Sequence, residues 1–127
     1  MNQKKNILKD KSFLFAIRIV NLYKHLINQK KEFVLSKQMV RSGTSIGANV
    51  REAYNAESKK DFIHKLSICQ KEADETAYWL ELLKATEFIS ISEFESINTD
   101  AFELYKIITS SILTTKNNLK KLTSDTE

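Results

Sequence analysis

Apolar residues recur every three or four positions along four stretches of the chain, the spacing that buries one face of an α-helix. Short interruptions separate these stretches: "EFV" at 32–34, "NAESKKDF" at 55–62 and "ISIS" at 89–92. The pattern predicts four helices. Their expected core positions are Phe13, Ala16, Ile17, Val20, Tyr23, Leu26 and Ile27; Met39, Val40, Ile46, Val50 and Tyr54; Phe62, Leu66, Cys69, Ala73, Thr76, Leu80 and Leu83; and Phe94, Ile97, Ala101, Leu104, Ile108 and Ile112.

Several side chains near the predicted helix starts can accept hydrogen bonds from free backbone N–H groups. Asp10 or Ser12 is a candidate cap for the first helix, and Ser36 for the second. Ser92, with Glu95 three residues later, has the spacing of a capping box at the fourth. We therefore expect helix starts at these positions.

Composition favours long helices over many short strands. The chain has 127 residues, no proline and only two glycines, so it offers few residues that form turns. Four long helices joined by short connections pack most simply as an all-α, antiparallel, up-down-up-down four-helix bundle. We expect a single domain over residues 1–127, with frayed ends at about 1–9 and 121–127.

No apolar run approaches the roughly 18 residues that span a bilayer, and the start "MNQKKNILKDK" lacks the apolar segment of a signal peptide. The single cysteine, Cys69, has no partner for an internal disulfide, which agrees with a reducing compartment. We expect a cytoplasmic protein that does not bind a membrane.

The two glycines, Gly43 and Gly47, lie four residues apart within the second predicted helix. Each costs a helix about 1 kcal/mol relative to alanine, so the pair needs a compensating contact. A phosphate-binding loop is disfavoured, because Ala48 and Asn49, rather than a lysine, follow the second glycine. We predict that both glycines permit close packing by another helix.

A polar stripe on the same helix comprises Arg41, Ser45, Asn49 and Glu52. It can simply face water. In an antiparallel hairpin that turns near residues 57 and 58, however, Arg41 comes level with position 74. We therefore predict an ion pair from Arg41 to Glu72 or Glu75, with the stripe completing a polar layer.

Positive charge is concentrated near the start of the chain. Residues 1–31 hold eight Lys or Arg and one Asp, although the whole chain has a net charge of only +4. Such a skew suits a polyanion, but solvated helix surfaces produce it too. The candidate contacts with a nucleic-acid backbone are Lys4, Lys5, Lys9, Lys11, Lys30 and Lys31. With only three arginines in the chain, base reading is less expected than backbone contact.

The residues give little support for catalysis. Ferritin-like metal sites need two Glu-x-x-His pairs, but the chain has only His25 and His64, of which only His64 has a carboxylate, Asp61, at that offset. Cys69 lies on the apolar seam, where a thiol is usually inert. Tyr78 and Trp79 are expected in the core or at a subunit contact, and Phe102 and Tyr105 are candidates for such a contact. We expect no catalytic, cofactor or metal site.

Two segments, "LSKQMVRSGTSIGANVREA" at 35–53 and "SKKDFIHKLSICQKEADETAYWLELL" at 58–83, resemble a bacterial four-helix-bundle family encoded in 23S ribosomal RNA intervening sequences. That family is also labelled the ribosomal S23 protein family. The matching residues are Arg41, Ser42, Gly43, Ser45, Ile46, Gly47, Asn49, Glu52, Phe62, Leu66, Glu72, Glu75, Trp79 and Leu80. The resemblance implies a homopentameric ring without catalysis, similar to the accessory proteins of diversity-generating retroelements, which bind nucleic acid.

Two functional hypotheses follow. The first is a non-enzymatic oligomeric bundle whose lysine-rich surface contacts the backbone of structured RNA, or less readily DNA. The alternative is a structural or adaptor ring that binds a protein partner and no nucleic acid.

Overall fold

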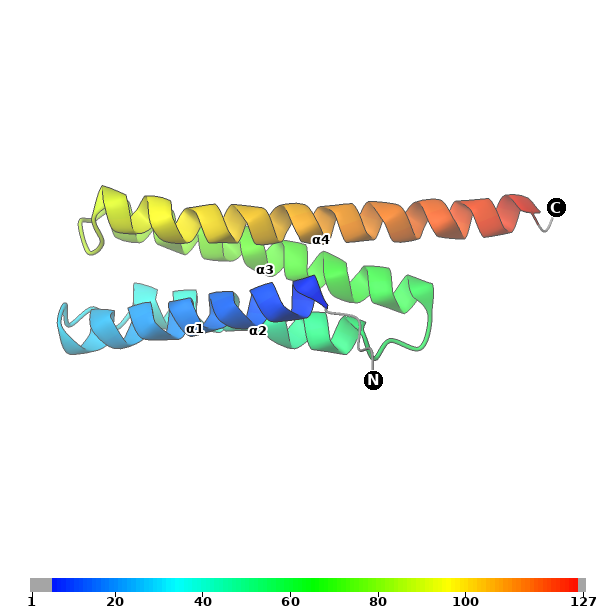
Figure 1. Ribbon diagram of the computed structural model, residues 1–127. Coiled ribbons are helices and arrows are strands. Elements are labelled where there is room, and N and C mark those ends of the chain that lie inside the picture. Colours follow the sequence, from blue (N-terminus) through cyan, green and yellow to red (C-terminus); the bar gives the residue numbers. More distant parts are fainter. Residues whose placement is uncertain (1–5, 126–127) are drawn as a thin grey trace.

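The computed structural model describes residues 6–125, with side chains up to residue 122, as four α-helices: α1 (Ile7–Asn28), α2 (Leu35–Ala53), α3 (Lys59–Ala85) and α4 (Ile91–Asp125). Each helix packs on the next along the chain, and α4 also packs on α1 (Figure 1). The α2–α3 contact is the most extensive and the α1–α4 contact the least. The predicted all-α, antiparallel four-helix bundle is confirmed, with no strand in the described range.

Regular helix reaches into both segments for which fraying was expected. α1 begins at Ile7, and α4 continues to Asp125. None of the described helices combines the length and apolarity needed to cross a membrane.

The predicted helix caps were wrong by two to six residues, because other polar side chains accept the hydrogen bonds of the free N–H groups. Asn6 accepts a hydrogen bond from the Lys9 N–H at 3.0 Å, so Asp10 and Ser12 lie inside α1. The capping box consists of Ser90 and Glu93 rather than Ser92 and Glu95: the Glu93 N–H donates to Ser90 Oγ, and the Ser90 N–H donates to Glu93 Oε1. Both pairs have the three-residue spacing of a capping box, so the spacing alone does not distinguish them.

The start of α2 is held by a buried carboxylate and not by Ser36. The N–H groups of Val34, Leu35 and Ser36 donate to the Glu32 carboxylate at N···O distances of 2.7–3.2 Å. Lys31 adopts a left-handed backbone conformation, with φ of 55°, in the turn that precedes this carboxylate. Burial alone would raise the pKa of Glu32, but the hydrogen bonds from these N–H groups outweigh it and lower the pKa.

The core follows the predicted seams of α3 and α4 closely. Every expected position on these two helices is buried except Phe62, which is half-buried. On α2, Met39, Ile46 and Val50 are buried and Val40 is half-buried, whereas Tyr54, just after the helix, is 41% exposed. These helices each carry one clear apolar stripe, so the period alone identifies the inner face.

The predicted inner face of α1 was wrong in part: Leu26 is buried as expected, and four expected positions are half-buried, namely Ala16, Val20, Tyr23 and Ile27. Phe13 and Ile17 are 53% and 42% exposed. The buried residues of α1 are Leu8, Ser12, Phe15, Ile19 and Leu26. Because α1 is apolar on more than one face, its sequence fits two stripes, and packing against α2 selects between them.

The glycines of α2 face α1. A Cβ added to Gly43 would lie 2.8 Å from Ile19 Cγ2, inside the closest approach of real atoms. A Cβ added to Gly47 would lie 3.4 Å from the Ser12 carbonyl oxygen, which is an ordinary contact. The close approach is therefore tight at Gly43 and looser at Gly47.

Candidate nucleic-acid interface

The lysines that the sequence suggested as one surface lie at opposite ends of the bundle. Lys9 and Lys11 lie in the first turns of α1, whereas Lys30 and Lys31 follow its last turn. The part of α1 that lies between Lys9 or Lys11 and its last residue, Asn28, separates the two pairs by about 25–30 Å. Lys4 and Lys5 fall outside the described residues. The structure thus does not bring the six predicted lysines together.

Local partners also distinguish the two lysines at the start of α1. Lys11 Nζ lies 2.6 Å from Glu103 Oε1 of α4 in an ion pair. Lys9 Nζ lies 5.5 Å from the centre of the Tyr54 ring and remains exposed. Lys9 is therefore the more accessible of the two for a phosphate.

α1 and α3 begin, and α2 and α4 end, toward the same end of the bundle, on the right in Figure 1. Basic residues of all four helices lie near these helix ends, those of α4 furthest out along the bundle. We call this group the basic end: Lys9, Arg51, Lys59, Lys60, Lys116, Lys120 and Lys121. All seven side chains are exposed, and no ion pair within the described part of the chain involves any of them. Acidic residues are present nearby, including Asp10, Glu57 and Asp61, but they are fewer.

Arg41 joins α2 to α3 on another side of the bundle. Its Nη2 donates to Glu75 Oε1, and its Nη1 lies 3.5 Å from Glu72 Oε2. The hydrogen bond from Arg41 lowers the pKa of Glu75, aided by a longer one from Trp79 Nε1 at 3.4 Å. The Arg41 side chain is 50% exposed, so this is a surface ion pair.

The rest of the polar stripe does not cross to α3 as one layer. Ser45 Oγ donates to the carbonyl oxygen of Arg41 at 2.7 Å, and Asn49 Nδ2 donates to that of Ser45 at 2.9 Å. Only Glu52 makes a second contact with α3, an ion pair with Lys65 at 3.4 Å. Short polar side chains on a helix readily bond to the preceding turn, which explains the difference from the predicted layer.

Sequence reasoning missed the buried polar contact between α2 and α3. Ser42 Oγ and Thr76 Oγ1 lie 2.9 Å apart, and both side chains are fully buried. Thr76 Oγ1 also lies 2.7 Å from the carbonyl oxygen of Glu72. A threonine within the apolar seam of α3 was the available signal, since a buried hydroxyl needs a partner.

The cysteine and the two histidines of the chain differ in their burial. Cys69 is buried, with Sγ 3.5 Å from the Ile46 carbonyl oxygen, and burial raises the pKa of its thiol to about 12. His25 and His64 are exposed on different helices. Between residues 6 and 125, no group of three or more His, Cys, Asp or Glu side chains is placed to hold a metal ion.

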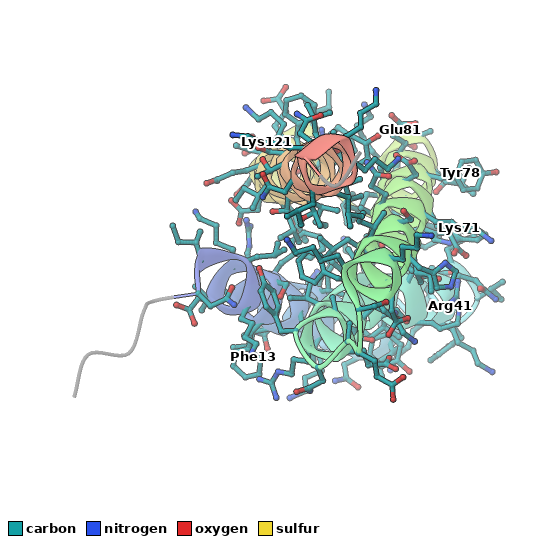
Figure 2. All side chains as sticks on the ribbon, turned by 90° about the vertical axis from the view of Figure 1, so that its right-hand side faces the viewer. Phe13, Arg41, Lys71, Tyr78, Glu81 and Lys121 are labelled. Carbon is teal, nitrogen blue, oxygen red and sulfur yellow. The ribbon has the colours of Figure 1, made fainter. Side chains whose placement is uncertain are left out.

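Aromatic residues beside the Arg41 pair form part of the outer surface. Tyr78 is 56% exposed and packs edge-to-face on the half-buried Trp79, with ring centres 5.0 Å apart. Figure 2 shows Arg41, Lys71 and Tyr78 on the same side of the bundle. On α4, Phe102 is exposed and Tyr105 is half-buried.

Comparisons with known proteins agree with the fold. The sequence model of a family described as "23S rRNA-intervening sequence protein" matches residues 4–110. A crystal structure from Bacteroides thetaiotaomicron, described as a protein with unknown function from the S23 ribosomal protein family, is similar with 61% identity and a TM-score of 0.83. The similarity covers 84% of this chain and 98% of that one. No protein with a curated description matches the chain.

Proposed function

Because this chain belongs to the 23S rRNA-intervening sequence protein family, we propose that it works as a non-enzymatic, oligomeric helical bundle that binds the phosphate backbone of structured RNA or DNA. The observation that carries the proposal is the basic end, where seven exposed cations have no ion-pair partner among the described residues. Neither the family description nor that of the similar crystal structure names a reaction.

The chemistry of the basic end suits phosphates better than base edges. Six of its seven cations are lysines, which act as flexible point charges. Two of the three arginines are already engaged, Arg18 with Asp100 at 2.7 Å and Arg41 with Glu75. Only Arg51 remains for the forked hydrogen bonds that read guanine, so backbone contact is the favoured mode.

Exposed apolar side chains support association between copies of the chain. Ile7, Leu14 and Ile17 form an exposed stripe on α1, and Leu14 and Ile17 line a groove of about 360 Å³ against α4. Phe102 is exposed on the other side of α4. We propose a homo-oligomer, and five is the number of subunits that the family resemblance implies. Light scattering should give about five times the chain mass of 14.7 kDa, and a monomer mass would refute association.

Salt-dependent binding tests the nucleic-acid proposal. Fluorescence anisotropy of a labelled ribosomal RNA hairpin, titrated at several salt concentrations, should show affinity that falls steeply as salt rises. The triple variant Lys9→Gln, Lys59→Gln, Lys60→Gln should bind more weakly. The matched control Lys24→Gln, Lys37→Gln, Lys84→Gln removes the same charge at the opposite end and should bind like the wild type. Absence of binding at low salt would refute the proposal.

A second candidate function is an adaptor ring that binds a protein partner and no nucleic acid. The cluster of Arg41, Tyr78 and Trp79 favours it, since these residue types are enriched at the energetic centres of protein interfaces. An oligomer that binds no RNA or DNA at low salt would support this candidate.

A further inference from the structure

We infer that residues 111–125 of α4, here called the α4 arm, form a phosphate-binding extension that this chain adds to the shared bundle. This inference rests on the proposed function and deepens it, because it assigns a nucleic-acid contact to a segment outside the family match. Its cations are Lys116, Lys120 and Lys121.

The α4 arm lies beyond the region that this chain shares with its family. The family match stops at residue 110, whereas α4 continues to Asp125. The similar crystal structure is matched over 98% of its own length but leaves about a sixth of this chain unmatched. The arm therefore lies outside the family match.

Packing leaves most of the arm open to solvent. The ion pair between Lys11 and Glu103 places the first turns of α1 beside the middle of α4, so the arm extends past the start of α1 (Figure 1). The hydrogen bond from Gln70 Nε2 to Thr109 Oγ1, at 2.9 Å, sets the register with α3. In residues 111–122, Ile112 is the one buried side chain. The arm is thus supported from one side, by the first turns of α3.

Charge divides α4 into an acidic half and a basic half. Its first half carries Glu93, Glu95, Asp100 and Glu103. Between Glu103 and Asp125 the sequence has four lysines and no acidic residue. This distribution of charge favours contact between an anionic partner and the carboxyl-terminal half of α4.

The spacing of the lysines suits a row of phosphates. Lys116 and Lys120 are four residues apart and share one helix face, whereas Lys121 lies about 100° around the helix from Lys120. All three side chains are exposed, and Figure 2 shows Lys121 on the outside of α4. In the antiparallel register set by Gln70 and Thr109, Lys120 is level with the first turn of α3, where Lys59 and Lys60 lie. The arm therefore supplies three of the seven cations of the basic end.

The test compares salt dependence in two full-length triple variants. Lys116→Gln, Lys120→Gln, Lys121→Gln removes the charges of the arm, and Lys24→Gln, Lys37→Gln, Lys84→Gln removes the same charge at the opposite end. Binding to a labelled RNA hairpin and to the DNA hairpin of the same sequence is followed by fluorescence anisotropy. Circular dichroism checks that both variants keep the helix content of the wild type.

Loss of the arm charges should make the slope of log K against log salt shallower by about 2 to 3, and lower the affinity on the order of 100-fold near 0.1 M salt. The control should keep the wild-type slope. If the wild type binds and the arm variant has the same salt slope and affinity as the wild type, the inference about the arm is refuted and the proposed function is not. A wild-type protein that binds neither hairpin at low salt would overturn the proposed function and the arm together.

Discussion

Replacing Gly43 by alanine tests the tightest contact in the bundle. The added Cβ would lie 2.8 Å from Ile19 Cγ2, 2.9 Å from Ile19 Cγ1 and 3.3 Å from Ile19 Cβ. Ile19 is fully buried and branched at Cβ, so it has few other rotamers to adopt. Overpacking of this kind costs about 1–3 kcal/mol. The better helix propensity of alanine returns about 1 kcal/mol.

Gly47→Ala provides a matched control one helical turn away. Its Cβ would meet the Ser12 carbonyl oxygen at 3.4 Å, an ordinary contact, so the helix propensity gain of up to about 1 kcal/mol should remain. Because that gain is common to both variants, their difference isolates the clash with Ile19. We expect Gly43→Ala to be less stable than Gly47→Ala by about 1–3 kcal/mol.

Urea unfolding followed by far-ultraviolet circular dichroism, at one fixed protein concentration, measures this difference even if the chain associates. Ile19→Ala should be strongly destabilising in the wild type, by about 2–5 kcal/mol, and less so in the Gly43→Ala background, where it relieves the clash. Equal stabilities of the two glycine variants, or additive effects of Gly43→Ala and Ile19→Ala, would refute the close approach.

Three further predictions concern side chains with a defined partner or environment. Arg41→Met and Glu75→Gln should each cost under about 1 kcal/mol at this exposed pair, and their double mutant should cost less than the sum; strict additivity in thermal melts would contradict the pairing. Glu32→Gln should cost about 1–2 kcal/mol at neutral pH, unlike the exposed Glu57→Gln. Because the folded pKa of Glu32 is lowered from 4.5, this cost is fully present above pH 4.5 and shrinks as pH falls through the folded value; a cost that is constant down to pH 2 would be inconsistent with it. The Cys69 thiol, with a pKa raised to about 12, should react with a disulfide reagent only on unfolding, and rapid labelling of the native protein would disprove its burial.

Sequence reasoning succeeded where the signal was local or repeated. The seams of α3 and α4 were predicted because each helix has a single apolar stripe. The contact of Arg41 with Glu72 and Glu75 followed from the length of one short connection, since a tight hairpin leaves little freedom in register. The wider polar layer did not follow, because Ser45 and Asn49 found partners in their own helix.

The sequence by itself determined the helix count, the all-α class and the inner faces of α3 and α4, because helical periodicity is a property of neighbouring residues. Tertiary structure alone decided which face of α1 is buried. α1 has two apolar faces, and the buried one is the face on which Ile19 packs against Gly43 of α2. It also decided where the positive charge gathers. Lys30 and Lys31 are closer to Lys9 in the chain than Lys59 is, but they lie about 30 Å away along α1, whereas Lys59 and Lys120, distant in the chain, share one end of the bundle. In an antiparallel bundle, residues that are far apart in the chain lie side by side on adjacent helices. A surface patch is made of such residues, so the sequence alone does not show which charges it contains.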